Sequence, residues 1–191
     1  MNAKSIITAA VLAAVLGAGA VSFAPMAYAE MTVMVGGAPM YPSKNIVENA
    51  VNSKDHTTLV AAVKAAGLVD TLASAGPFTV LAPTNEAFAA LPKGTVDTLL
   101  KPENKGMLTG ILTYHVISGK FTMADIAAKV DEMGGKFAVK TVAGGELTFM
   151  RSGKKHLTVT DAKGDVANIT IADVLQSNGV IHVINKVMLP G

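Results

Sequence analysis

The chain lacks cysteine and tryptophan altogether and has few of the other aromatic residues. Its 191 residues contain no Cys, no Trp, three Tyr and six Phe. The absence of cysteine excludes disulfide-stapled scaffolds, thiolate metal sites and anchoring through a lipidated cysteine. Stability must therefore come from packing, and a core with so few aromatic residues must be largely aliphatic.

A surplus of charge of either sign is also missing. The chain carries 16 Lys and Arg residues against 14 Asp and Glu residues. The basic residues are scattered, and nothing resembles the concentrated basic face that binds nucleic acid or an anionic membrane. We therefore expect no nucleic-acid partner.

A long apolar run is found only at the beginning of the chain. Lys4 precedes the apolar segment 6–19, and an Ala-Tyr-Ala site for signal peptidase follows at 27–29. The segment is short for a spanning helix of roughly 20 residues, which disfavours a membrane anchor. We predict a signal peptide over 1–29 and a mature chain that starts at Glu30, is secreted or periplasmic, and does not span a membrane.

Motifs typical of enzymes are missing as well. The chain contains no Gly-x-Ser-x-Gly elbow, no His-Glu-x-x-His pair and no Gly-x-x-x-x-Gly-Lys phosphate loop. We predict that the protein is not an enzyme. A serine that the fold brings beside a histidine stays open, so a hydrolase is kept as the third alternative.

The histidines show no spacing that predicts a metal site. His56, His115, His156 and His182 lie far apart, and no two share the i, i+2 or i, i+4 spacing that places two imidazoles on one face. We therefore predict no metal site and no cofactor.

Residues 30–45 form a lead-in rich in glycine, proline and methionine. Met31, Met34 and Met40 could supply thioether ligands for Cu(I) in an exported protein. Apolar anchoring of the lead-in onto the domain explains them better, because no His or Cys joins the cluster. A periplasmic protein that binds a small molecule or a metal is the second alternative for the function.

The stretch 76–88 contains a separate cue for each of its transitions. Segment 78–81 is typical of a buried strand, and Pro83 lacks the amide proton that a longer strand would need. Thr84 or Asn85 can cap a helix that starts here. The sequence therefore predicts a strand that leads sharply into a helix, and this junction is expected to be structural.

The first half of the mature chain has helical periodicity. A short helix is expected over 43–50 with Ser43 as its cap, and a longer one over 59–66. Thr122 with Asp125 resembles a capping pair for a further helix.

The second half changes to the alternating pattern of strands. Helices followed by strands, without regular alternation, indicate a single α+β domain. Strands are expected at 114–117, 137–141, 147–149, 157–160, 166–171, 180–184 and 187–189.

Three separated motifs resemble those of the fasciclin family, whose domain is also called FAS1. They are Phe-Thr-Val-Leu-Ala-Pro-Thr-Asn-Glu-Ala-Phe at 78–88, Leu-Thr-Tyr-His-Val at 112–116 and Asn-Gly-Val-Ile-His-Val-Ile-Asn at 178–185. Their order and spacing also agree with that family, and the resemblance places its domain at 46–190. It implies a β-sandwich wedge decorated by helices from the N-terminal half.

The resemblance also implies a function and candidate partner-binding residues. Fasciclin domains mostly mediate adhesion, so we expect a protein partner on a cell surface or matrix, or a like domain. Tyr114 and His115 match a tyrosine-histidine motif implicated in integrin binding by animal relatives. Asp173 and Val174 match an Asp-Ile pair with a similar role, although Val stands here in place of Ile.

A structural alternative accompanies these candidates. His115 and His182 lie among apolar residues, where a buried imidazole bonded to the backbone is favoured over a partner contact. The motif residues expected to be structural are Phe78, Pro83, Thr84, Asn85, Phe88, Asn178, Gly179 and His182.

Overall fold

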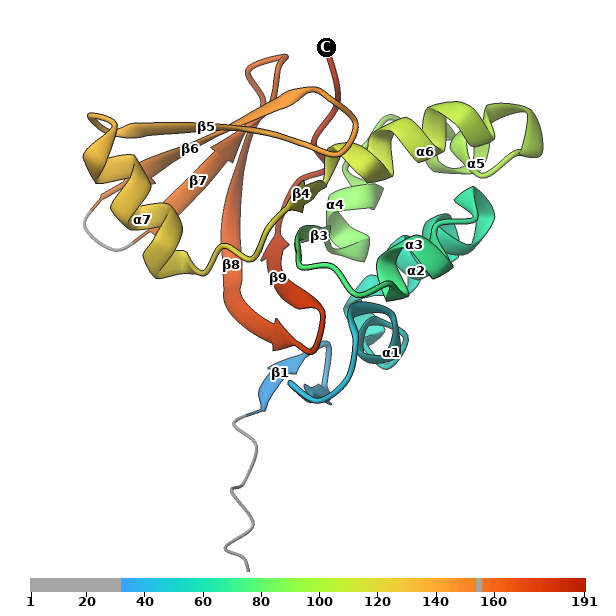
Figure 1. The fold of residues 1–191 in the computed structure, drawn as a ribbon. Helices are drawn as coiled ribbons and strands as arrows, with labels where there is room; N and C mark the ends of the chain where they lie inside the picture. The colour runs from blue at the N-terminus through green and yellow to red at the C-terminus, as the bar shows by residue number, and fades with distance from the viewer. Residues whose placement is uncertain (1–31, 154–155) are drawn as a thin grey trace, which may run out of the picture.

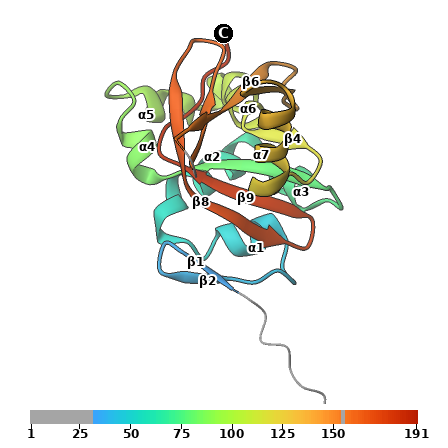
Figure 2. The same ribbon diagram turned by 90° about the vertical axis from the view of Figure 1, so that its left-hand side faces the viewer.

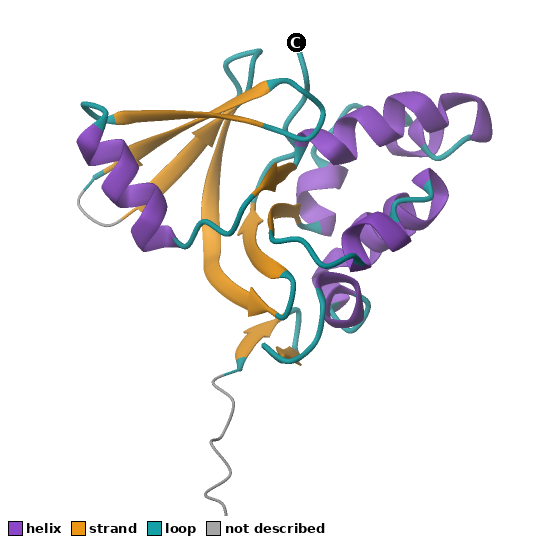
Figure 3. Cartoon of the chain, in the orientation of Figure 1, coloured by secondary structure: helices purple, strands orange, loops and turns teal. Residues whose placement is uncertain are grey.

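The computed structural model describes residues 32–153 and 156–191, and the predicted signal peptide and Met31 lie outside these residues (Figure 1). Helices α1 to α6 gather on one side of the molecule, and most of the sheet lies on the other side (Figure 3). Helix α7 covers the far side of the sheet. The helices are α1 (Ile46–Ala50), α2 (Thr57–Ala66), α3 (Val69–Ala73), α4 (Asn85–Ala89), α5 (Thr95–Leu99), α6 (Lys105–Tyr114) and α7 (Met123–Glu132), with short 3-10 helices η1 (Lys54–His56) and η2 (Pro102–Asn104).

Seven strands form one sheet in the order β4-β3-β9-β8-β7-β6-β5 within the described chain. All neighbours are antiparallel except β3 and β9, which are parallel. Figure 2 shows the long strand β8 beside β9 across the middle of the molecule. The predicted α+β class and the fasciclin-type wedge are thus confirmed. The strands are β3 (Phe78–Pro83), β4 (Val116–Ser118), β5 (Lys136–Lys140), β6 (Glu146–Ser152), β7 (His156–Thr160), β8 (Val166–Gln176) and β9 (Gly179–Ile184).

The lead-in is a small hairpin of β1 (Val33–Val35) and β2 (Ala38–Met40). Met40 is only 3% exposed and packs into the domain, whereas Met34 is 57% exposed. Apolar anchoring thus accounts for Met40. Met40 lies opposite Val33, and Met34 lies opposite Pro39, so the two methionines point to opposite faces of the hairpin.

Two predicted helix caps have different outcomes. The N-cap of α1 is Asn45, not Ser43, because Asn45 and Glu48 form a reciprocal capping box. Thr122 and Asp125 form the same arrangement at the start of α7, as predicted.

Strand β3 runs further than the sequence predicted. The strand was expected over 78–81, before Pro83, yet β3 continues to Pro83, which lies opposite Ile184 of β9. A parallel strand alternates its bonding, so a residue without an amide proton can stand at its end. The amide of Thr84 then donates to the Ile184 carbonyl at 3.3 Å.

The predicted strand 114–117 begins later than expected. Helix α6 continues to Tyr114, with His115 at its C-cap, and the strand starts at Val116. The buried positions Leu108, Ile111 and Leu112 continue the helical period to this point. The strand expected at 187–189 is also wrong, since these residues are irregular, although Val187 and Met188 are buried.

Buried apolar residues form two clusters, one on each side of the sheet's centre. The helical core consists of Val35, Met40, Ile46, Leu59, Ala62, Val63, Ala66, Leu72, Val80, Ala82, Ala87, Phe88, Leu99, Leu108, Ile111, Leu112, Val116, Val174, Ile181, Val183 and Val187. The sheet core consists of Leu81, Tyr114, Ile117, Ile126, Val130, Phe137, Leu147, Phe149, Leu157, Val159, Ala167, Ile184 and Met188.

Candidate functional site

Tyr114 lies in the interior of the sheet core. Its side chain is 0% exposed, its hydroxyl donates to the Glu146 carbonyl at 2.6 Å, and it accepts from the Ala162 amide at 3.0 Å. The loop around Gly145 passes against the ring, because a Cβ added at Gly145 would meet the ring at 2.6 Å. Burial raises the pKa of the hydroxyl, so it stays protonated and able to donate. Tyr114 therefore ties α6 to two loops of the sheet half.

His115 is buried between the two cores. Its Nδ1 donates to the Ile111 carbonyl at 2.8 Å, and its Nε2 accepts from the Met188 amide at 2.9 Å. These two partners require the neutral ring with its proton on Nδ1. Burial lowers the pKa of His115 to about 4, which keeps the ring neutral. The interior alternative thus describes the placement of both Tyr114 and His115.

Asp173 sits at an irregularity of β8. The register against β9 shifts between Ile171 and Val174, and Asp173 has a φ of 55°. Asp tolerates this left-handed region better than most residues with a side chain. Its carboxylate accepts from the Met123 amide, the first of α7, at 2.7 Å. Asp173 therefore fastens α7 to the bent middle of β8.

His182 of β9 connects Asp173 of β8 to the segment that precedes α7. Its Nδ1 accepts from the Asp173 amide at 3.2 Å, and its Nε2 donates to the Phe121 carbonyl at 2.9 Å. Burial also lowers the pKa of His182. Val174, the partner predicted with Asp173, is 1% exposed and packs in the helical core. The predicted Asp173-Val174 pair thus has a half-buried member and a buried one.

Asn178 and Gly179 join three elements at the start of β9. The Asn178 amide group donates to the carbonyls of Leu72 at 2.8 Å and Ser74 at 2.7 Å, and its Oδ1 accepts from the Ile46 amide at 3.0 Å. Gly179 has no side chain because a Cβ there would overlap the backbone carbonyl of Phe78. These contacts connect the start of β9 to α1, to the end of α3 and to β3.

The junction after β3 carries two side chains that accept from backbone amides at the starts of helices. Thr84 is the N-cap of α4 and accepts from the Ala87 amide at 3.3 Å. Asn85 instead serves a different helix, since its Oδ1 accepts from the Thr58 amide at 3.0 Å in the first turn of α2. Phe88 is buried in the helical core, and Phe78 packs partly buried against it.

An exposed surface at the end of the β8–β9 hairpin was not predicted. Leu175 is 38% exposed, and Tyr41 is 37% exposed with the Lys44 ammonium 5.1 Å from its ring centre. The segments that carry them are joined, because Asn49 bonds to Gln176, the residue after Leu175, and to the backbone of Tyr41. We call Tyr41, Lys44 and Leu175 the hairpin-end surface. The alternation along β8, with Leu175 between two buried residues, was the signal that could have revealed it.

A buried Ser53–His56 pair is the nearest approach to catalytic geometry. Ser53 Oγ lies 2.8 Å from His56 Nδ1, and both residues are 3% exposed. A serine nucleophile normally pairs with a histidine whose other nitrogen is oriented by a carboxylate. His56 Nε2 has no hydrogen-bond partner in the described chain, and burial lowers the pKa of the ring. This arrangement lacks the orienting group that a hydrolase needs.

Metal ligands do not gather anywhere within residues 32–153 and 156–191. In this part of the chain no group of three or more His, Asp or Glu residues could hold a metal ion. The same residues contain no helix of the length and apolar character that crossing a membrane requires.

Comparison with known proteins decides the family. The model of the fasciclin domain matches residues 54–190. The chain belongs to the fasciclin domain family. It is 47% identical over 176 residues to Protein sll1483 of the cyanobacterium Synechocystis, with 92% of this chain and 89% of that protein covered.

Animal fasciclin proteins match over a smaller share of their length. The chain is 37% identical to the transforming growth factor-beta-induced protein ig-h3 of pig, covering 78% of this chain and 20% of that protein. A solved FAS1 domain pair from the insect cell adhesion molecule fasciclin I has the same fold, with a TM-score of 0.70 at 16% identity. That match covers 84% of this chain and 58% of the insect chain.

Proposed function

We propose that this fasciclin domain works by binding a protein partner in cell adhesion or surface and matrix association, rather than by catalysis. The observation that carries the proposal is membership of the fasciclin family, which includes a solved domain pair from an adhesion molecule. The partner is a protein on a cell surface or matrix, or a like domain on another copy.

The hairpin-end surface is the place where we expect the partner to bind. Tyr41 and Leu175 expose apolar area next to a cation, a composition that favours protein interfaces. The two segments that carry them are held together, because Asn49 and Gln176 are buried and hydrogen bonded to each other. Asp173 lies two residues from Leu175 on the same strand, so the predicted position of the Asp-Ile pair borders this surface.

Tyr114 and His115 contribute to partner binding indirectly, because they hold α6, two loops and the segment at Met188 in place. Both side chains are buried, at 0% and 2% exposed, so a docked partner would touch residues around them. Replacing them would weaken partner binding indirectly, because α6 and the loops at Glu146 and Ala162 would lose their attachment.

Capture of partners by the purified domain tests the surface. Surface and matrix proteins would be passed over the immobilised domain and over a Tyr41→Ala, Leu175→Ala double variant. We expect the variant to bind about tenfold more weakly or worse, because aromatic and apolar anchors dominate interface energies.

A matched control uses exposed apolar residues elsewhere. Met107 and Met133 are 62% and 61% exposed, and a Met107→Ala, Met133→Ala variant should bind like the parent. Equal loss in both double variants would reject the hairpin-end surface. A deletion strain that attaches and aggregates like its parent would count against adhesion itself.

The signal-peptide pattern at 1–29 supports a location outside the cytoplasm, which needs its own test. We propose that the chain is cleaved after Ala29 and is secreted or periplasmic. Mass spectrometry of the periplasmic and extracellular fractions should find a protein that begins at Glu30. Detection of the intact N-terminus in the cytoplasm alone would reject the proposal.

A further inference from the structure

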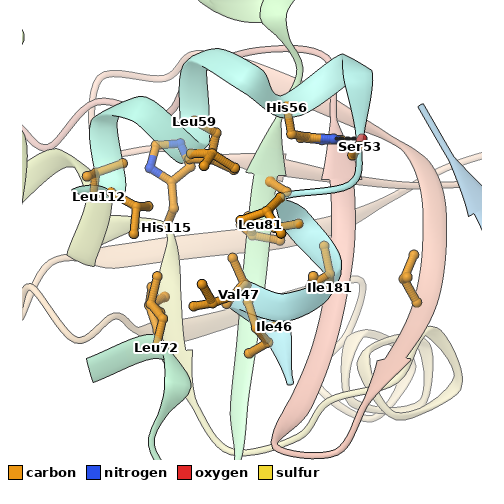
Figure 4. A pocket seen from close by; sticks show the side chains of 18 of the residues that line it. Ile46, Val47, Ser53, His56, Leu59, Leu72, Leu81, Leu112, His115 and Ile181 are labelled. Atoms are coloured by element: carbon orange, nitrogen blue, oxygen red, sulfur yellow. Dashed lines mark hydrogen bonds between the residues drawn. The ribbon is translucent and has the colours of Figure 1, made fainter. Parts of the chain in front are cut away.

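An apolar cavity lies between helices α1, α2, α3 and α6 and strands β3 and β9. Its volume is about 60 Å³. Figure 4 shows the labelled side chains arranged around it, with Ile46 and Val47 from α1, Leu59 from α2 and Leu81 from β3. Most of the lining belongs to the helical core, and it includes Met40 and Val174, the residues before Tyr41 and Leu175 of the hairpin-end surface.

The walls offer almost nothing to water. The polar side chains in the lining are Ser53, His56, Lys64 and His115. Ser53 bonds to His56, and both nitrogens of His115 have backbone partners. His56 Nε2 is the buried atom of this lining that has no hydrogen-bond partner among the described residues.

Water is a poor occupant of such a space. One buried water needs about 10–15 Å³ of volume and makes about three hydrogen bonds, so several waters would have to share one free ring nitrogen. An apolar guest meets no such penalty, since it needs only close contact with the aliphatic walls. The volume suits a slender chain of roughly four to six methylene-sized groups.

The rim of the cavity lies between α1 and α2 and carries a positive charge. Val51 is 49% exposed and Val47 and Val60 are half-buried, so the lining reaches the surface along these helices. Lys64 is exposed on the same rim and forms no ion pair with another residue of the described chain. An anionic head group would therefore find a cation beside the opening of an apolar space.

We propose that the cavity binds a single-chain aliphatic carboxylate, with its chain inside and its carboxylate near Lys64. The chain lies against Leu59, Leu81 and Leu112. His56 Nε2 marks the polar limit of the cavity. This inference does not depend on the proposed protein-binding role, and either can fail alone.

A series of straight-chain carboxylates from butanoate to decanoate tests the proposal by isothermal titration calorimetry with the purified protein. Each added methylene should tighten binding about fourfold until the cavity is filled at about five to seven carbons, a count that includes the carboxyl carbon outside it. Longer chains should gain nothing more. No binding at millimolar concentration, or affinity that is independent of chain length, would overturn the proposal.

Two variants separate the chain from the head group. Ala50→Leu fills the rim from α1 and should weaken octanoate at least tenfold, whereas Ala61→Leu, an exposed site outside the lining, should not. Lys64→Gln should weaken octanoate up to about fivefold and leave octanol unchanged, because an exposed ion pair is weak. Lys101→Gln, a change at an exposed loop lysine, should alter neither.

The variants also contain outcomes that reject the proposal. Equal effects of Ala50→Leu and Ala61→Leu would place the ligand elsewhere, and equal loss of octanoate and octanol in Lys64→Gln would remove the head-group contact. If Ala50→Leu fails to fold, nuclear Overhauser effects between octanoate and Leu59 in the parent protein decide. Their absence at saturating octanoate would reject the site.

Discussion

The two cores of this domain are filled by different means. The sheet core contains Tyr114 and Phe149, both almost fully buried, and Phe137 stacks on Phe149 with ring centres 6.3 Å apart. The helical core depends mainly on Val, Leu, Ile and Ala and encloses the 60 Å³ cavity. Tyr114, Phe137 and Phe149 thus fill much of the sheet core, whereas Phe88 is the aromatic member of the helical core, where smaller aliphatic side chains leave a space.

The sheet core is therefore expected to be the more rigid part of the domain, and the helical core the part that can take up a guest. A dense core resists any change of volume, whereas a core with a cavity has room for a guest or for an added methyl group. His115 joins the two, because it bonds to Ile111 of the helical core and Met188 of the sheet core.

The largest expected effect is the loss of Tyr114. Tyr114→Ala should lower the free energy of unfolding by about 3–5 kcal/mol, since it empties a fully buried aromatic site. Tyr114→Phe should cost about 1–3 kcal/mol, because it leaves the Ala162 amide without its partner. Urea unfolding followed by circular dichroism measures both. A Tyr114→Ala protein of unchanged stability that no longer captures partners would instead support direct contact.

Acid should weaken the connection between the two cores. The folded pKa of His115 is about 4 and its unfolded pKa is about 6.5, so the unfolded chain takes up the proton first. Stability should therefore be undiminished above about pH 6.5, fall as pH drops, and level off below about pH 4 after a loss of about 3 kcal/mol. The lowered pKa values of His56 and His182 act in the same direction.

Urea titrations between pH 7.5 and pH 4 measure this dependence. A His115→Gln variant should show a shallower decline than the parent protein, even though its stability at neutral pH is lower. A decline as steep as that of the parent would assign the effect to other groups.

Two Gly→Ala substitutions, one against the sheet core and one on α6, should change stability by smaller amounts and in opposite directions. Gly145→Ala should destabilise by about 1–3 kcal/mol, because its Cβ would meet the Tyr114 ring. Gly110→Ala, in the middle of α6 with open space around it, should stabilise by about 0.5–1 kcal/mol. Thermal melts of the two variants give the comparison. A loss of stability in both would show that α6 does not tolerate the extra methyl group.

The smallest expected change in stability comes from adding one methyl group to a valine in each core. Val159→Ile in the sheet core should destabilise by about 1 kcal/mol, because the residue is 0% exposed and closely packed. Val63→Ile, at the cavity, should stabilise by up to about 0.8 kcal/mol as it fills empty space. Effects of equal sign in urea unfolding would abolish the distinction between the two cores.

The sequence predicted the elements whose pattern depends on neighbours along the chain. The capping pair Thr122 and Asp125 and the strands β5, β6 and β9 were anticipated, because their cues are local. The end of α6 at Tyr114 was missed because an aromatic residue before β-branched ones satisfies a helix end and a strand start equally.

Features that need distant partners could not be predicted. Asn85 accepts from the amide of Thr58 in the first turn of α2, although the two residues are 27 positions apart. The cavity likewise needs α1, α2, α6 and β3 to be placed together before any space between them exists. The irregularity at Asp173 became visible only through its φ and its bond to Met123.

Strand β9 sits in the middle of the sheet, between β3 and β8, yet it is the last strand of the described chain. Synthesis proceeds from the N-terminus, so the centre of the sheet is filled only after β9 has been made. Until then β3 and β8 each present an open edge that can pair with another chain. Completion of the sheet is thereby postponed until the last described strand has been made.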